Sequence, residues 1–332
     1  MKRLVSRRDF LKGAAAALAA AQAGCSFLGP EEKNYGGVPT RPLGKTGERV
    51  SIVGMGGWNI ANAKDEREAI AILQAAVDGG MTFFDNCWDY HDGRSEELMG
   101  KALEGGRRDK VFLMTKVCAR DYKGALRHLD DSLRRLRTDR LDLWQFHGIQ
   151  WEDDPQLIFA EDGALRAALE AKEAGKVRFI GFTGHKHPKF HLAMLAMPFE
   201  WDAVQMPLNV LDAHYLSFQK TVLAECVRRR IGAIGMKALG AQGGRIPKEL
   251  SFRAADLRRY VLSLPVSTLV CGIETREDLE QDLAIAREFR PMTPAEVEAL
   301  HEKSAEPSRD GRIEAYKTGN FGCDWHHLQA KG

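Results

Sequence analysis

The stretch VFLMTKVCARDYKGALRHLDDSLRRLRTDRLDLWQFH, residues 111–147, decides the fold of this 332-residue chain. It begins with one short apolar run, Val111–Thr115, and ends with another, Leu141–Phe146. The segment between them carries leucines spaced three or four positions apart: Leu126, Leu129, Leu133 and Leu136. That spacing predicts a helix with one buried face, and uninterrupted apolar runs are typical of parallel strands covered on both sides. The stretch therefore reads as a strand–helix–strand unit.

The same alternation extends in both directions along the chain. The other strands are predicted near Ile52–Gly54, Thr82–Asp85, Val177–Phe182, Ala203–Met206, Ala233–Met236 and Thr268–Val270. Amphipathic helices are predicted at Glu66–Val77, Ser95–Leu103, Gly124–Leu136, Gly163–Ala174, Phe190–Ala196, Leu216–Arg229, Ala254–Leu262 and Glu277–Glu288. Eight such units in about 240 residues predict an α/β fold, a single-domain (β/α)8 TIM barrel. A doubly wound sheet is the competing layout, but Gly54–Gly57 lacks the third glycine of its dinucleotide fingerprint.

Residues 1–25 are predicted to be a signal peptide rather than part of the fold. Ser6–Lys12 resembles the twin-arginine consensus, and Ala21–Ala23 fits the signal-peptidase rule. The apolar stretch Gly13–Ala23 is too short to span a bilayer comfortably, so no stable transmembrane segment is expected. A lipoprotein signal with an acylated Cys25 is the alternative. The sequence thus predicts export by the twin-arginine machinery to the periplasm or another extracytoplasmic space.

The rest of the chain is divided by composition. Residues 26–40, punctuated by glycine and proline, are expected to be a linker. Residues 41–290 form the predicted barrel, and the polar residues 291–332 are expected to form an irregular C-terminal tail that caps the barrel mouth. The 48 basic and 46 acidic residues give a formal net charge of +2, which argues against nucleic acid as a partner. The six cysteines form no CxxC pair, so neither a disulfide framework nor a zinc ribbon is predicted.

Three predicted strands end in polar side chains that can carry chemistry. Asp85 ends the second strand, Lys116 the third and His147 the fourth. In a TIM barrel the active site forms at the carboxyl ends of the strands, so neighbouring strands bring such residues to one place. Each residue alone has an ordinary structural explanation, such as a buried salt bridge or a core histidine. Together they predict an active site.

One stretch makes this prediction specific. GMTFFDNCWDY, residues 80–90, followed by GRSEELMG at residues 93–100, resembles the signature of the aldo-keto reductase family. In that signature a strand-ending Asp is followed five residues later by a Tyr and then by the start of a helix. Lys116 and His147 fall where the family keeps its other two catalytic residues. The resemblance runs from about Thr40 to Ala286 and implies a nicotinamide-dependent oxidoreductase that interconverts a carbonyl and an alcohol.

The residue types suit that chemistry. Hydride addition builds negative charge on the carbonyl oxygen, which Tyr90 can protonate, although a phenol has an ordinary pKa of about 10. Lys116 is expected to lower that pKa by stabilising the phenolate, and Asp85 to keep the lysine charged. His147 is expected to orient the substrate oxygen or donate a hydrogen bond to it. In the oxidative direction Tyr90 would act as the base.

By resemblance, a second group of residues is expected to bind NAD(H) or NADP(H). Its members are Gly56, Thr183, Gln205, Lys237, Leu239, Gly240, Gly272, Glu274, Arg276, Asp278 and Asp282. Thr183 and Gln205 stand where the family holds the nicotinamide carboxamide, but Gly184 replaces the usual Asn. Lys237 replaces a family serine in the segment that wraps the pyrophosphate, where it can pair with phosphate.

The segment after the eighth strand bears on the choice of nucleotide. Glu274 and Asp278 carry negative charge that would repel a 2′-phosphate, whereas carboxylates accept hydrogen bonds from a ribose hydroxyl. Arg276 is the opposing charge. We therefore expect NAD(H) to serve at least as well as NADP(H).

The substrate side and metal sites are less specified. Trp58 and Trp88 follow strand ends and are expected to line the pocket for a small carbonyl or alcohol, a sugar among the candidates. No metal site is predicted: Cys87 and Cys118 each lie two residues beyond a catalytic position, but the family tolerates small residues there. His185 and His187, and the run Cys323–His327, are read as a solvated loop and a packing tail.

Two other functions stay open at the level of sequence. One is a protein that binds the cofactor without turnover, as a regulatory subunit. The other is an enzyme that cycles a tightly held cofactor within one substrate, as in epimerisation. The complete set of four catalytic residues favours turnover.

Overall fold

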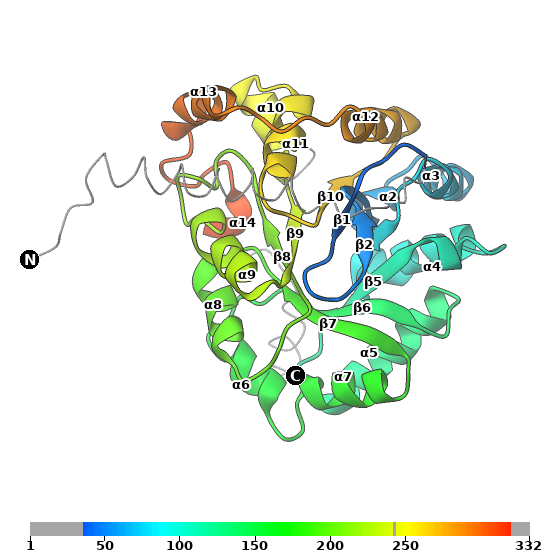
Figure 1. Cartoon of the computed structure of the whole chain (residues 1–332). Helices are drawn as coiled ribbons and strands as arrows, with labels where there is room; N and C mark the ends of the chain where they lie inside the picture. The colour runs from blue at the N-terminus through cyan, green and yellow to red at the C-terminus, as the bar shows by residue number, and fades with distance from the viewer. Residues whose placement is uncertain (1–35, 242–243, 320–332) are drawn as a thin grey trace, which may run out of the picture.

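The computed structural model describes residues 36–241 and 244–319. Eight parallel strands close into a barrel in the order β10-β3-β4-β5-β6-β7-β8-β9, with helices around the outside (Figure 1). The strands are β3 (Val53–Gly56), β4 (Phe83–Asp85), β5 (Phe112–Val117), β6 (Leu141–Phe146), β7 (Val177–Thr183), β8 (Ala203–Pro207), β9 (Gly232–Met236) and β10 (Thr268–Gly272). The predicted single-domain (β/α)8 barrel is confirmed, and each predicted strand is found to within a residue or two at its ends.

Seven of the eight predicted helices are found within two residues of their predicted ends. The predicted helix Leu216–Arg229 is instead a π-helix over Gln219–Leu223 followed by a short α-helix. Up to β7 the helices are α2 (Gly57–Ile60), α3 (Glu66–Asp78), α4 (Arg94–Ala102), α5 (Tyr122–Arg135), α6 (Asp154–Phe159) and α7 (Ala164–Glu173). After β7 they are α8 (Pro188–Ala196), α9 (Ala224–Arg229), α10 (Arg245–Leu250), α11 (Ala254–Ser263), α12 (Arg276–Arg287), α13 (Pro294–Ala305) and α14 (Ala315–Thr318).

Helix α5 shows how the leucine spacing was realised. Asp121 caps its first turn by accepting a hydrogen bond from the backbone N–H of Gly124 at 2.8 Å. Leu129 is fully buried, while Leu126 and Leu133 are partly buried at the edge of the same core. The buried face therefore includes small and polar positions as well as the leucine row: Gly124, Ala125, His128 and Ser132.

A hairpin closes the amino end of the barrel. Strands β1 (Thr40–Pro42) and β2 (Arg49–Ser51) pair antiparallel, and Leu43 and Val50 enter the barrel floor. There they pack with side chains from the strands: Phe83, Phe112, Met114, Leu143, Ala203 and Ile234. Thr40, where the predicted linker ended, is thus the first residue of a strand.

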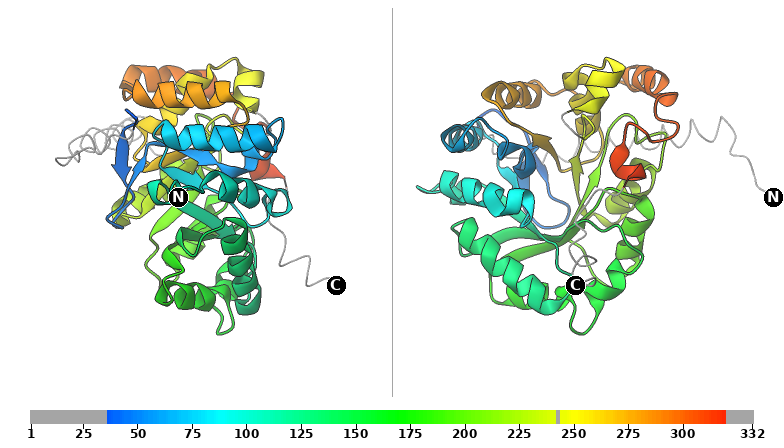
Figure 2. Two further views of the ribbon diagram at one scale, coloured as in Figure 1. Left: turned by 90° about the vertical axis from the view of Figure 1, so that its right-hand side faces the viewer. Right: turned by 180° about the vertical axis from the view of Figure 1, so that it is seen from behind.

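The other end of the barrel carries the C-terminal helix. Helix α14 lies on the face opposite the hairpin, as the side view shows (Figure 2). The expectation of an irregular chain after residue 291 is wrong, because α13 is a regular helix. It begins with a capping box between Thr293 and Glu296 and with Pro294 in its first turn, both of which favour a helix start.

Several sequence predictions fall outside the described residues. These are the signal peptide with Ser6–Lys12, the acylation candidate Cys25, and the Cys323–His327 run. Within residues 36–241 and 244–319, no helix combines the length and apolar character needed to cross a bilayer.

Candidate active site

Three of the predicted catalytic residues meet at the carboxyl ends of β4 and β5. The Lys116 ammonium donates to Asp85 Oδ1 at 2.8 Å and to the Asn86 carbonyl at 2.7 Å, and it lies 3.1 Å from the Tyr90 hydroxyl. Asp85 and Lys116 are each 2% exposed, so the ion pair is shielded from water. Tyr90 stands at the start of a short 3-10 turn, Tyr90–Gly93, directly above the pair. The lysine thus connects a buried carboxylate to a phenol.

The electrostatics of this group differ from the sequence-based expectation. Burial raises the pKa of Tyr90 above its ordinary value, and the opposing effect of the Lys116 ammonium does not cancel that rise. Burial also acts to lower the pKa of Lys116, but Asp85 and Tyr90 hold that pKa above its ordinary value. Lys116 therefore acts on the pKa of Tyr90 in the expected direction, but burial has the larger and opposite effect. At neutral pH Tyr90 keeps its proton beside a charged lysine.

Gln205, in the middle of β8, extends the group. Its amide Nε2 donates to Asp85 Oδ2 at 2.7 Å, whereas its Oε1 is buried and accepts no hydrogen bond from the described residues. Thr183 is its register partner on β7 and is also buried. A buried amide oxygen without a donor is costly, so it marks a place where a ligand N–H fits. The carboxamide of a nicotinamide ring has such an N–H.

His147 contacts a second set of polar groups on the same face. Its Nδ1 lies 3.2 Å from Cys87 Sγ, 3.5 Å from Cys118 Sγ and 3.6 Å from Asp89 Oδ1. Burial acts to raise the pKa of Asp89, but His147 and the two thiols hold that pKa below its ordinary value. The His147 ring stands edge-on to the Tyr90 ring at 5.8 Å. The Nδ1 atom of His147 is therefore engaged with the side chains that follow β4 and β5.

Lys237, after β9, brings a further positive charge to the mouth. Its backbone has φ +60°, a left-handed conformation that is uncommon for a residue with a side chain. Its ammonium lies 5.3 Å from the centre of the Tyr316 ring. Burial and the charge of Lys116 lower the pKa of Lys237 to about 8. The next turn closes with a hydrogen bond from Gly240 N–H to the Lys237 carbonyl, and Leu239 packs against the core.

The segment after β10 is organised around two carboxylates. Glu274 Oε1 accepts hydrogen bonds from Asn59 Nδ2 at 2.6 Å and from Asn62 Nδ2 at 3.2 Å. Asp278 Oδ2 accepts from the backbone N–H groups of Glu274 and Thr275, as part of the capping box of α12. Asp278 is therefore engaged in starting the helix, and Glu274 is the carboxylate nearer the barrel face.

The remaining members of the predicted cofactor set have varied surroundings. Arg276 lies 3.5 Å from Glu68 on α3 and is half exposed. Asp282 is fully buried and pairs with Arg258 at 2.5 Å, so it serves the packing of α11 against α12 and we leave it out of the site. Gly56 and Gly272 lack room for a side chain: a Cβ would lie 2.6 Å from the Cys271 carbonyl and 2.4 Å from Asn59 Oδ1, respectively.

The two predicted pocket tryptophans behave differently. Trp58 is 52% exposed, and its ring meets the Tyr90 ring edge-on at 5.3 Å, so it stands at the rim of the catalytic group. Trp88 instead stacks face to face on His128 of α5 at 3.5 Å and donates to Asp131. Its indole therefore packs against α5, and a pocket role for Trp88 is not supported by its position.

Sequence reasoning missed several groups around the site. Arg120 donates to the carbonyls of Cys118 at 3.1 Å and His147 at 2.7 Å, and its guanidinium forms a buried ion pair with Asp154 at 2.7 Å. His185, interpreted from the sequence as part of a solvated loop, instead has a buried Nδ1 and faces Tyr316, with the ring centres 5.7 Å apart. The position of Arg120, just after a predicted strand, could be seen in the sequence. Its pairing with Asp154 on α6 could not.

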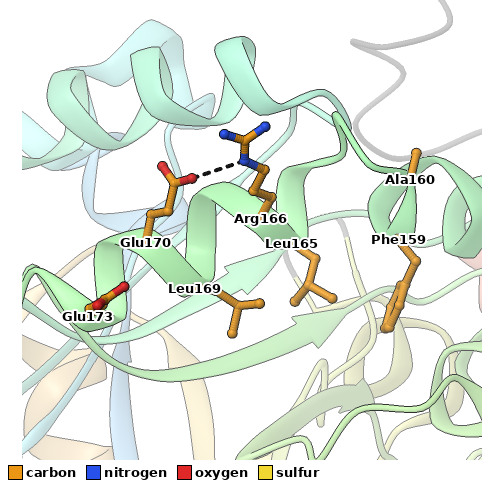
Figure 3. Close-up of a pocket in the computed structure, with 7 residues that line it drawn as sticks. All are labelled: Phe159, Ala160, Leu165, Arg166, Leu169, Glu170 and Glu173. Atoms are coloured by element: carbon orange, nitrogen blue, oxygen red, sulfur yellow. Dashed lines mark hydrogen bonds and ion pairs between the residues drawn. The ribbon is translucent and has the colours of Figure 1, made fainter.

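A surface depression of about 300 Å³ lies away from these residues, between α6 and α7. Phe159, Leu165 and Leu169 line it, and Arg166 pairs with Glu170 at its edge (Figure 3). It sits on the outer helix layer rather than at the carboxyl ends of the strands, so we do not assign the chemistry to it.

Comparison with known proteins identifies the family to which the chain belongs. The chain matches the Aldo/keto reductase family over residues 52–250. It is 31% identical over 236 residues to aldo-keto reductase YhdN of Bacillus subtilis, a match covering 66% of this chain and 68% of that protein. The fold resembles aldo-keto reductase AKR11C1 from Bacillus halodurans, with a TM-score of 0.65, 21% identity, and coverage of 82% of this chain and 100% of that chain.

A second solved structure is that of an aldo/keto reductase from Klebsiella pneumoniae in complex with NADP and acetate. Its TM-score is 0.64 at 20% identity, covering 80% of this chain and 95% of that chain. These two structures support the fold, while the family match spans more than half of the sequence and includes all four predicted catalytic positions. The chain belongs to the aldo/keto reductase family, and it is an oxidoreductase.

Proposed function

We propose that the protein reduces a small carbonyl compound to an alcohol with NADH or NADPH, with Tyr90 as the proton donor. The observation that carries this proposal is the Lys116 ammonium held between the Asp85 carboxylate at 2.8 Å and the Tyr90 hydroxyl at 3.1 Å. A proton donor near a fixed positive charge suits a reaction that builds negative charge on oxygen.

Each of these residues has a separate role in the proposed reaction. Tyr90 holds a proton in the folded protein and can give it to the carbonyl oxygen, because Lys116 stabilises the resulting phenolate. Asp85 keeps Lys116 charged and in place. His147, held through Nδ1, directs Nε2 to the same oxygen and orients it. Trp58 at the rim shields the reacting group from water.

The nucleotide supplies the hydride when bound. Gln205 Oε1 and Thr183 would hold its carboxamide, and Lys237 would pair with its phosphates. The glycines at 56, 240 and 272 would let the backbone approach it closely, and Glu274 would accept from the adenosine ribose. Leu239, Arg276 and Asp278 would support the segments that carry these contacts.

We also propose that the protein acts outside the cytoplasm after twin-arginine export. The support is the Ser6–Lys12 motif in the sequence. A fusion of residues 1–25 to a reporter that is active only after export would test it, with Arg7→Lys plus Arg8→Lys as the control. Export of the double variant at the same level would contradict the proposal.

The test of the reaction is Tyr90→Phe. General acid catalysis contributes about 10²- to 10⁴-fold, so we expect turnover of an aldehyde panel with NADH and NADPH to fall by that amount. Nucleotide binding, followed by quenching of tryptophan fluorescence, should be unchanged. Tyr122→Phe, a partly buried tyrosine of α5 whose hydroxyl bonds to Glu170, is the matched control and should retain full activity.

The outcome also separates the alternatives. Undiminished turnover in Tyr90→Phe would rule out the proton-donor role. A wild-type protein that binds nucleotide but turns over none of the panel would favour a cofactor-binding subunit. Nucleotide that stays bound through purification, together with interconversion of sugar epimers without added nucleotide, would favour the redox-cycling enzyme.

A further inference from the structure

Four metal-ligating side chains outside the Tyr90–Lys116–Asp85 group converge at the carboxyl ends of β4, β5 and β6. Each offers one ligand atom, and these atoms all lie within 4.8 Å of one another: Cys87, Asp89, Cys118 and His147. They come from three successive strand ends, so the barrel and not the local sequence brings them together.

The distances from His147 Nδ1 to the other ligand atoms are close to those of a small coordination sphere. A tetrahedral zinc with Zn–S of about 2.3 Å and Zn–N of about 2.0–2.1 Å places its ligand atoms about 3.3–3.8 Å apart. The distances from His147 Nδ1 to Cys87 Sγ, Cys118 Sγ and Asp89 Oδ1 are 3.2, 3.5 and 3.6 Å. Two thiolates, an imidazole and a carboxylate form a donor set that favours zinc over magnesium or calcium.

The surroundings hold these donors in place. Both cysteines are fully buried and neither forms a disulfide. Asn86 Oδ1 accepts from the Cys87 N–H at 2.8 Å, and Arg120 donates to the carbonyls of Cys118 and His147. Fixed backbones around the ligands are what a preformed metal site requires.

Access and charge are also suited to a cation. The Asp89 and His147 side chains are 30% and 13% exposed, which gives a path from solvent to the two buried sulfurs. A zinc ion with two thiolates and one carboxylate carries a net negative charge, and the Lys116 ammonium lies beside it, near enough for its charge to interact with Cys87. That neighbour would offset the excess negative charge.

We propose that four side chains bind one Zn²⁺ ion in a tetrahedral site: Cys87, Asp89, Cys118 and His147. From the sequence, no metal site was predicted at Cys87 and Cys118, because the family tolerates small residues at those positions. Coordination through Nδ1 keeps the His147 proton on Nε2, the nitrogen that faces the substrate in the proposed reaction. The ion would thus be a positioning device for His147, and its binding does not depend on the reaction being correct.

The test uses the full-length protein, purified without chelator and analysed for metals by mass spectrometry. We expect about one zinc per chain. After removal of the metal, titration with Co²⁺ should give a thiolate-to-cobalt charge-transfer band and the intense visible bands of tetrahedral cobalt. Cys87→Ala and Cys118→Ala should each lose the zinc and weaken the charge-transfer band, with circular dichroism unchanged.

The matched controls are Cys226→Ala and Cys271→Ala, which alter equally buried cysteines elsewhere, and Cys323→Ala in the C-terminal run. All three should keep the zinc and the cobalt spectrum. Three results would overturn the site: no bound zinc and no cobalt charge-transfer band in the wild type, metal lost only in Cys323→Ala, or a Cys87–Cys118 disulfide in the purified protein. Asp89→Asn, which preserves shape, should lower zinc affinity without abolishing the cobalt–thiolate band.

Discussion

At the scale of single residues, burial and charge compete at each functional atom. Tyr90 illustrates the balance: the ammonium 3.1 Å away favours the phenolate, but removal of the phenol from water outweighs it and raises its pKa. The result favours a protonated donor over a ready base. The protonated phenol is the form that carbonyl reduction requires, and the same group would act as the base in the reverse direction.

We expect the choice of nucleotide to depend on Glu274. Glu274→Gln keeps an acceptor for Asn59 and Asn62 but removes the negative charge. A unit charge about 4 Å away is worth about 1 kcal/mol in water, so affinity for NADPH relative to NADH should rise by roughly fivefold. Fluorescence titration with both nucleotides gives the ratio.

The control for that prediction is Glu280→Gln, an exposed position one turn further along α12. It should leave the ratio of the two affinities unchanged. An equal ratio in Glu274→Gln and the wild type would mean that Glu274 does not face the 2′-position.

At the scale of elements, helix starts set the loops that surround the mouth. The capping box of α12 uses Thr275 and Asp278, and that of α13 uses Thr293 and Glu296. The first box orders the segment after β10, which carries the proposed adenosine contacts, while the second lies beyond the barrel strands. The two capping boxes are alike in structure, but we expect only the one at the start of α12 to affect nucleotide binding.

Thr275→Ala and Thr293→Ala form a matched pair that tests this difference. Each loses a capping hydrogen bond, so each should lower the free energy of unfolding by about 1 kcal/mol, measured by urea denaturation. Only Thr275→Ala should also weaken nucleotide binding, because its loop contains Glu274. Equal nucleotide affinity in the two variants would show that the α12 start does not shape the site.

At the scale of the whole molecule, the two ends of the barrel have different roles. Its amino end is closed by the β1–β2 hairpin, whose Leu43 and Val50 fill the floor. Its carboxyl end holds the catalytic and proposed metal groups. Buried titratable groups lie between the barrel and its helices, among them His128, His191 and Asp282.

These buried groups predict acid sensitivity. Burial lowers the pKa of His128 and of His191 from 6.5 to about 4, so the unfolded chain binds more protons between these values. Stability is therefore lost as pH falls from about 6.5 to 4, by about 3 kcal/mol for each histidine. Burial raises the pKa of Asp282 to about 6 and also raises the pKa values of Glu96 and Glu314, so these three carboxyls act in the opposite direction. Burial lowers the pKa of His301 to about 4 and that of His185 well below its ordinary value, and these two groups add to the loss of stability in acid.

Urea denaturation across this pH range measures the effect. His191→Gln can keep a donor to the Gln205 carbonyl, which lies 3.1 Å from His191 Nε2, and it should flatten the dependence on pH. His91→Gln, at the rim beside Trp58, should leave the dependence as in the wild type. A wild-type protein equally stable at pH 4 and 6.5 would contradict the prediction.

The periodicity of this sequence was enough to determine the barrel and the strand ends. Continuous apolar runs ending in Asp85, Lys116 and His147 predicted both the architecture and the neighbours of the site, since strand order follows chain order in such a barrel. The irregular tail was wrong because α13 starts by local capping rather than by a strong apolar stripe. Trp88 was misplaced because the direction of a side chain after a strand depends on which helix it packs against.

The amino-acid order alone thus determined which residues reach the carboxyl end of the barrel, because a repeating strand–helix unit leaves little choice of topology. The burial of these side chains, their neighbouring charges and the distances between them depend on the tertiary structure. The net effect on Tyr90 required knowing how much water burial removes, and the Cys87–Asp89–Cys118–His147 cluster required three strand ends at a common height. Both depend on distances through space, which spacing along a chain does not encode.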